Sequence, residues 1–159
     1  MAKAREIPGI HGQMSFGAVA RQAVAIRAEE LFEHSAGVLD TDDIERVHDM
    51  RVATRRLRAV LEVFAPAFEP GAHKTVLSDV KALADALGAR RDPDVQLEHL
   101  QRLLDDLPAE DRPGLEVFAH RLRVEQAQGN QTLALALERM RDDDLEGRLR
   151  ALVAEPVAS

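Results

Sequence analysis

The chain has 159 residues, of which 45% are hydrophobic and 31% are charged, and its formal net charge is -7. This length suits one domain with a single hydrophobic core, and the balance of apolar and charged residues excludes both a disordered chain and a membrane-spanning one. The absence of cysteine excludes disulfides, thiolate metal sites and cysteine nucleophiles. The first ten residues contain no apolar run typical of a signal peptide, which predicts a cytoplasmic protein.

Trp and Tyr are absent, and Ala, Leu, Glu and Arg dominate, a composition that favours helices over strands. Apolar residues recur with helical periodicity along most of the sequence. We therefore predict an all-α protein, an antiparallel bundle of the four-helix type with about five or six helices. Residues 1–15 are expected to form an irregular N-terminal arm, residues 16–153 a single helical domain and residues 154–159 a C-terminal tail.

The first two helices are expected on either side of a short polar loop. The first is expected at Phe16–Val38, with Gly37 marking its end. Thr41 or Asp42 is expected to cap the second helix, since Glu45 follows Asp42 by three residues in the pattern of a capping box. This second helix is predicted to continue to about Ala65, where the next residue is a proline.

The middle of the sequence predicts two further helices with a break between them. One is expected at Ala72–Leu87 and to end at Gly88 in a left-handed C-terminal cap. Asp92 followed by Pro93 resembles a helix start, since the carboxylate can cap free amides and proline suits the first helical position. A separate helix is therefore predicted from Asp92 to about Leu107.

Two helices complete the prediction. A long one is expected at Gly114–Met140, and Gly129 with Asn130 is its weakest point because both residues have low helix propensity. Asp142–Asp144 provide a cap for a last helix that ends near Val153.

The net charge hides a segregation of charge along the chain. The segment from Arg46 to Arg91 contains nine Lys or Arg residues and five acids, so it carries +4 while the remainder of the chain carries -11. Such segregation can produce a basic face on a protein whose total charge is negative.

Apolar and basic residues lie on opposite sides of the second predicted helix. The apolar side consists of Met50, Ala53, Leu57, Val60, Leu61 and Phe64, and the basic side of His48, Arg51, Arg55 and Arg58, with Arg56 beside them. Aligned cations repel one another by a few tenths of a kcal/mol per pair, so acidic neighbours or an anionic ligand must offset the repulsion. The arginines could simply pair with carboxylates of the protein, but their planar forks also suit phosphate oxygens.

Two segments resemble the motifs of the CHAD domain, the conserved histidine α-helical domain. They are Val47–Arg58 (VHDMRVATRRLR) and Leu87–Val95 (LGARRDPDV). The resemblance extends over residues 16–153 and implies non-catalytic binding of inorganic polyphosphate by a basic helical surface. Family members resemble two four-helix bundles related by a pseudo-two-fold axis, and this chain resembles one half. We therefore expect a homodimer, since closed two-fold pairs are the commonest assembly.

The resemblance also implies which residues bind polyphosphate. They are His48, Arg51, Arg55, Arg56, Arg58, Lys81, Arg90 and Arg91, with His73 and Lys74 as weaker candidates. Asp92 matches the second motif too, but we assign it to helix capping because an acid would oppose a polyanion. The implied location is the cytoplasm, at polyphosphate granules.

Other functions find less support in the residues. Metal chelation by histidines, or binding of another polyanion, is the alternative function, although the six histidines contain no i,i+4 pair and no cysteine accompanies them. No Ser-His-Asp set and no glycine-rich phosphate loop is present, so we expect neither an enzyme nor a cofactor. Aromatic stacking platforms are absent, so nucleic acid is not an expected partner, and neither is a membrane.

Overall fold

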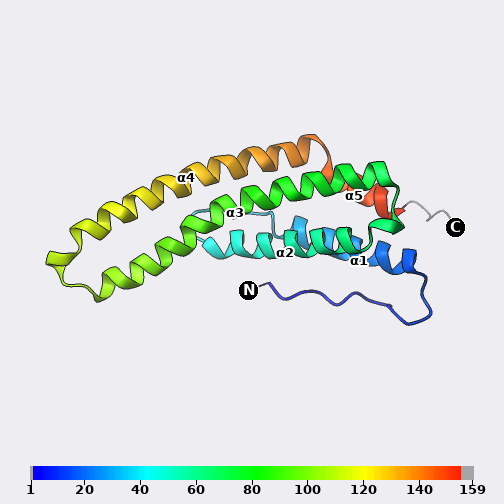
Figure 1. The fold of residues 1–159 in the computed structure, drawn as a ribbon, viewed down its shortest axis with the longest axis horizontal. Helices are drawn as coiled ribbons and strands as arrows, with labels where there is room; N and C mark the ends of the chain where they lie inside the picture. Colours follow the sequence, from blue (N-terminus) through cyan, green and yellow to red (C-terminus); the bar gives the residue numbers. More distant parts are fainter. Residues whose placement is uncertain (1, 155–159) are drawn as a thin grey trace.

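A computed structural model describes residues 2–154 and confirms the all-α prediction, with five α-helices, two short 3-10 turns and no strand among those residues. The α-helices are α1 (Phe16–Glu33), α2 (Ile44–Val63), α3 (Pro70–Asp106), α4 (Pro113–Asp142) and α5 (Leu145–Ala154). Helices α3 and α4 form a long antiparallel hairpin (Figure 1). Helices α1, α2 and α5 pack around one half of this hairpin, and the other half extends beyond the bundle (Figure 1).

The first two helices are present, but their ends differ from those predicted. Helix α1 ends at Glu33, and Gly37 adopts a φ of 68° in the loop that follows. Helix α2 begins after Asp43, which makes no side-chain capping bond, so the expected capping box of Asp42 and Glu45 is wrong. The carboxylate of Asp43 instead accepts a hydrogen bond from Arg46 at 3.1 Å.

The break predicted near Gly88 is also wrong, because α3 is one continuous helix of 37 residues. Gly88 does not have a positive φ, Pro93 lies inside the helix, and Asp92 is an exposed mid-helix residue rather than a cap. Proline in a helix interior removes one backbone hydrogen bond. Pro93 and its neighbour Asp94 are both buried, which indicates that packing stabilises the helix across this point.

The last two predicted helices are both present in the structure. Helix α4 is continuous through Gly129 and Asn130, and Asp144 caps α5 by accepting the backbone N–H of Gly147 at 3.1 Å. The predicted tail, residues 154–159, lies outside the described residues except for Ala154, which ends α5.

The apolar side chains form two separate cores. The main core takes residues from all five helices, and the predicted apolar side of α2 contributes Met50, Leu57 and Leu61, each fully buried. The smaller core contains only α3 and α4 residues, centred on Leu100, Leu104, Ala119 and Leu122. The part of the hairpin beyond the bundle is therefore only two helices thick. None of the helices described is both long and apolar enough to cross a membrane.

The N-terminal arm lies in an irregular conformation beside α1 and α2 (Figure 1). The backbone N–H of Ala2 donates to Asp49 of α2 at 2.8 Å, and that of Arg5 donates to Glu30 of α1 at 2.6 Å. The Arg5 guanidinium forms ion pairs with Glu29 and Glu33. The arm thus contacts both of the first two helices.

Helices α3 and α4 approach each other closely at Gly129. A Cβ atom added there would lie 2.8 Å from the carbonyl oxygen of Ala89 and 3.1 Å from the Cα of Arg90, whereas one added at Gly88 would meet nothing within 4 Å. The helix pair therefore needs glycine at position 129 and not at position 88.

Gly129→Ala is expected to lower the free energy of unfolding by about 1–3 kcal/mol, because the methyl group would push against the backbone of α3. Gly88→Ala is the matched control and is expected to raise it by about 0.5–1 kcal/mol through helix propensity alone. Urea denaturation followed by circular dichroism measures both. Equal stabilisation by the two variants would show that the helices do not approach closely at Gly129.

Candidate functional site

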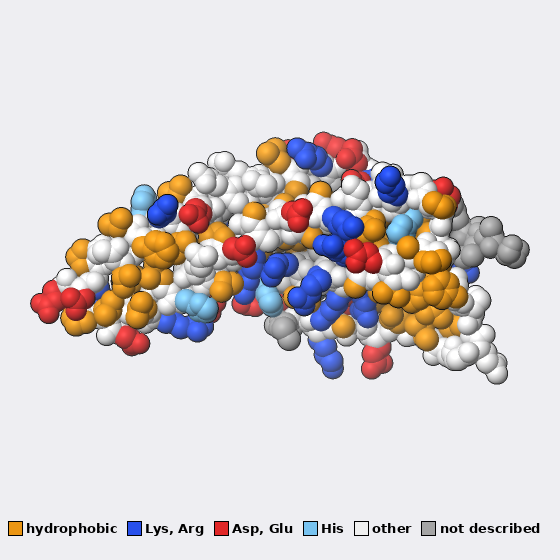
Figure 2. Space-filling model, in the orientation of Figure 1, with side chains coloured by type: hydrophobic (Ala, Val, Ile, Leu, Met, Phe, Trp, Pro, Cys, Tyr) orange, Lys and Arg blue, Asp and Glu red, His pale blue; other side chains and the backbone are white. Residues whose placement is uncertain are grey.

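Basic side chains gather over α2 and the neighbouring turns of α3. Figure 2 shows them at the centre of the visible face, with a few acids among them. We call Arg51, Arg55 and Arg58 of α2, together with Lys81 of α3, the cationic face. Helices α2 and α3 run antiparallel, and this brings the Lys81 ammonium to 3.6 Å from the carboxylate of Glu62 on α2. The Arg58 Nε atom donates to the same Glu62 oxygen at 3.0 Å.

Arg51 and Arg55 differ from the other cations of this face. Both side chains are exposed, and within the described residues neither forms an ion pair or a side-chain hydrogen bond. They are four residues apart on one helix, which is about 6 Å along its axis. Two adjacent positive charges are therefore left without a counter-charge from residues 2–154.

Glu62 partly neutralises the cationic face. The hydrogen bond from Arg58 is the main reason that the pKa of Glu62 is lowered, and Lys81 adds to the effect. Both ion pairs are about half exposed to solvent, where such pairs are weak and exchange readily with other anions. Arg58 and Lys81 are thus cations whose present partner can be displaced.

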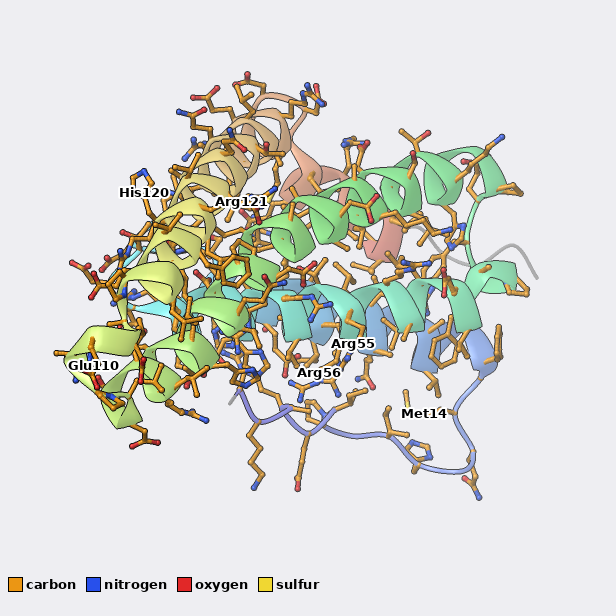
Figure 3. The ribbon with its side chains drawn as sticks, turned by 60° about the vertical axis from the view of Figure 1, so that its left-hand side comes forward. Met14, Arg55, Arg56, Glu110, His120 and Arg121 are labelled. Atoms are coloured by element: carbon orange, nitrogen blue, oxygen red, sulfur yellow. The ribbon has the colours of Figure 1, made fainter. Side chains whose placement is uncertain are left out.

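Arg56 and Arg91 lie at the border of the cationic face and bind backbone carbonyls. Arg56 donates to the carbonyl of Ala2 at 3.0 Å, and Arg91 donates to that of Ile44 at 3.4 Å. Arg55 and Arg56 project from the same turn of α2, with Arg56 on the side of the N-terminal arm (Figure 3). Both border arginines are partly buried, so they contribute positive potential more than open hydrogen-bond donors.

Arg90 is not part of the cationic face, which corrects its assignment as a binding residue. Its side chain is fully buried and forms an ion pair with Asp94 one turn further along α3. Two side chains of α4 complete the cluster: Asn130 accepts from the Arg90 Nε atom at 3.2 Å, and Gln126 donates to Asp94 at 2.6 Å. Arg90 therefore stabilises the crossing of α3 and α4.

The two weaker candidates, His73 and Lys74, differ in their exposure to solvent. His73 is buried, with its Nε2 atom 2.7 Å from the carbonyl oxygen of Leu61 and its ring stacked on Phe68. It therefore cannot meet a ligand at the surface and is removed from the predicted set. Lys74 is exposed, and its side chain has no hydrogen bond or ion pair within the described part of the chain.

His48 lies one turn before Arg51 and is partly exposed. Glu45, His48 and Asp49 offer ligand atoms within 4.8 Å of one another, the one such group of potential metal ligands found in residues 2–154. Asp49 already accepts the backbone N–H of Ala2. This group could hold a divalent cation, although all three side chains come from exposed or half-exposed positions of a single helix.

Sequence reasoning identifies one acidic contributor to this region and misses one neutral contributor. Glu62 is the one acid within the basic side of this helix, and its spacing of four residues from Arg58 predicts the ion pair. The backbone carbonyl of Ala2, the partner of Arg56, carries no sequence signal because any residue could supply it.

The sequence of the chain is similar to a known family and to proteins of Mycobacterium tuberculosis. A family model described as "CHAD domain" matches residues 22–159. An uncharacterized protein of Mycobacterium tuberculosis strain H37Rv, Rv2226, is 35% identical over 89 residues. These residues make up 56% of this chain and 17% of that relative. Its counterpart in M. tuberculosis strain CDC 1551, the uncharacterized protein MT2285, is 34% identical over 89 residues, with the same coverage. The matched region thus spans about a sixth of the length of either relative.

Asp94→Ala is expected to lower the free energy of unfolding by about 3–5 kcal/mol, because it leaves the buried Arg90 charge without its partner. Asp92→Ala removes an exposed carboxylate from the same helix. It is expected to change the free energy of unfolding by less than about 0.5 kcal/mol. Thermal and chemical denaturation compare the two variants directly. A similar small effect of both would contradict the structural role assigned to Arg90.

Proposed function

The chain belongs to the CHAD family, and we propose that it binds inorganic polyphosphate without catalysis, along the cationic face of α2 and α3. One observation carries the proposal: Arg51 and Arg55 are exposed, adjacent and without a counter-charge in the described part of the chain. A polyphosphate chain carries negative charge at every unit, so one ligand can neutralise both arginines and continue to Arg58 and Lys81.

The binding mechanism is multivalent and electrostatic. Each guanidinium presents several N–H donors in a plane and can bind two phosphate oxygens at once. Binding releases counterions condensed on the polyanion, so the affinity falls steeply as salt rises. The helix holds the arginines at fixed spacing, and this lowers the entropy lost when they bind. A protein of this kind would lie in the cytoplasm, at polyphosphate granules.

The groups that a phosphohydrolase would need beside the cationic face are already engaged. Glu62 is bound to Arg58 and Lys81, and Asp49, of the group formed with Glu45 and His48, accepts the backbone N–H of Ala2. Hydrolysis of phosphate esters and anhydrides by metal ions requires carboxylates that coordinate the metal next to the substrate. The face is suited to capture rather than to turnover.

A second candidate function is binding of a divalent cation by Glu45, His48 and Asp49, which lie close enough to share one ion. We rank it below polyphosphate binding because Asp49 is engaged by Ala2. The two functions make different demands, since polyphosphate binding through arginines needs no metal. Titrations in EDTA therefore distinguish them.

Arg51→Ala and Arg55→Ala are each expected to weaken binding of long-chain polyphosphate about three- to fivefold, the loss of one exposed charge pair. Each should also reduce the slope of log affinity against log salt by about 0.7–0.9, since one fewer phosphate is neutralised. Isothermal titration calorimetry in EDTA at several salt concentrations measures both quantities.

Arg123→Ala is the matched control, because Arg123 is exposed on α4, has no ion pair within residues 2–154 and carries the same charge. Its affinity and salt slope should equal those of the wild type. If all three variants bind alike, the cationic face is not the site. If binding disappears in EDTA, the metal-binding function is favoured.

Glu62→Gln is expected to strengthen polyphosphate binding about two- to fivefold, because it frees Arg58 and Lys81 from their exposed ion pairs. Glu98→Gln is the control, since Glu98 forms an equivalent exposed pair with Arg102 on α3 outside the cationic face. The same titration applies. Unchanged or weaker binding by Glu62→Gln would mean that the ligand does not reach Arg58 and Lys81.

A further inference from the structure

The part of the α3–α4 hairpin beyond the bundle exposes apolar side chains. We call this part the extension and define it as residues 97–122. Leu103, Val117 and Phe118 are 50%, 73% and 45% exposed, although the small core of the extension lies beside them. A layer of two helices can bury only the sides that face each other, so the outer sides remain uncovered. Exposed apolar residues gathered in this way mark interaction surfaces.

The tip of the extension is strongly acidic. From Asp105 to Glu116 there are five acids and one arginine, a local charge of -4. None of these five acids forms an ion pair with any residue from 2 to 154. The arginine, Arg112, donates to the carbonyl of Leu107 instead. The extension thus combines uncompensated negative charge with exposed apolar side chains.

The complementary charge is present in the same chain but at a different place. Arg51 and Arg55 of the cationic face are the unpaired bases described above, and they lie on α2, in the bundle. Glu110 marks the tip of the extension and Arg55 the middle of α2, well apart in Figure 3. The two surfaces cannot meet within one molecule without unfolding the hairpin.

Both surfaces lie on the same face of the molecule. Figure 2 shows the acidic tip and the hydrophobic side chains of the extension at one end and the basic side chains at the centre of that same face. Consider a two-fold axis that is parallel to this face. It crosses the line from the tip to the cationic face at its midpoint and at right angles. It places the tip of each copy on the cationic face of the other, so both contacts form at once and the assembly closes as a dimer.

We propose that the extension docks on the cationic face of a second copy of this chain, in a reciprocal two-fold dimer. Acids of the tip, such as Glu110 and Asp111, then neutralise Arg51 and Arg55 of the partner, and Val117 and Phe118 become covered at the edge of the contact. The inference rests on the cationic face assigned under the proposed function. It adds that this face has a protein occupant, which polyphosphate must displace.

The test begins with the mass of the wild-type chain by light scattering, over protein concentrations of about 1–100 μM. At an ionic strength of about 10 mM, where charges interact over roughly 30 Å, a dimer is expected. Added long-chain polyphosphate should convert it to monomer with ligand bound. A monomer at every concentration overturns the proposal, and so does a dimer that stays intact while calorimetry shows polyphosphate bound to it.

Two charge-reversed variants test the contact itself. Glu110→Lys with Asp111→Lys alters the tip, and Arg51→Glu with Arg55→Glu alters the cationic face. Each variant alone is expected to be monomeric, because acid would meet acid or base would meet base. An equimolar mixture should restore a dimer, since both contacts of the mixed pair are complementary. A mixture that stays monomeric while both variants keep their helical circular dichroism contradicts the reciprocal contact.

Glu138→Lys with Asp142→Lys is the matched control, because it makes the same change in charge at exposed acids of α4 far from the tip. This control should remain dimeric. Calorimetry with polyphosphate separates the two proposals. The tip variant should bind the ligand at least as tightly as the wild type, because it has lost only the competing tip. If no protein binds polyphosphate, the proposed function fails, and the dimer measurements still decide the docking contact.

Discussion

The close crossing of α3 and α4 at Gly129 is the constraint on which the rest of the structure depends. A glycine at this position lets the two backbones touch, and the contact encloses the Arg90–Asp94 pair together with Gln126 and Asn130. Asn130 also donates to the carbonyl of Leu39 and so joins the crossing to the loop between α1 and α2. The main core lies on one side of this polar layer and the small core on the other. The crossing therefore fixes both the position of α3 beside α2 and the direction of the extension.

The fold keeps two oppositely charged surfaces apart, the cationic face and the acidic tip of the extension. The chain carries -7 overall, yet Arg51 and Arg55 have no counter-charge in the described residues, and neither have the acids of the tip. Opposite charges remain unpaired because α2 belongs to the bundle and the tip to the end of the hairpin. A rigid separation of this kind leaves two surfaces that favour external partners. Flexible segments that carried these two opposite charges would neutralise each other instead. The net charge alone therefore indicates nothing about affinity for a polyanion.

Helical periodicity was sufficient to predict the fold class and the two sides of α2, because a repeat of 3.6 residues determines which side chains face a core. It was insufficient at Gly88 and Pro93, where local signals for a helix end and a helix start were overridden by packing against α4. It also could not separate Arg90 from Arg91. Neighbouring residues on a helix point about 100° apart, so one is buried and the other borders the cationic face. Only knowledge of where α4 packs distinguishes them.

The two motifs of the family resemblance thus divide between different tasks. In the second motif, Leu87, Arg90, Pro93 and Asp94 are all buried, so its pattern reflects the demands of the α3–α4 crossing. In the first motif, Val47, Met50, Ala53 and Leu57 point into the core, while Arg51 and Arg55 remain exposed without partners. Core positions explain the apolar residues of this helix but give no reason for two adjacent unpaired arginines, which cost electrostatic repulsion. Packing does not explain these two arginines. They therefore favour an anionic partner at the first motif, on α2, rather than at the second motif.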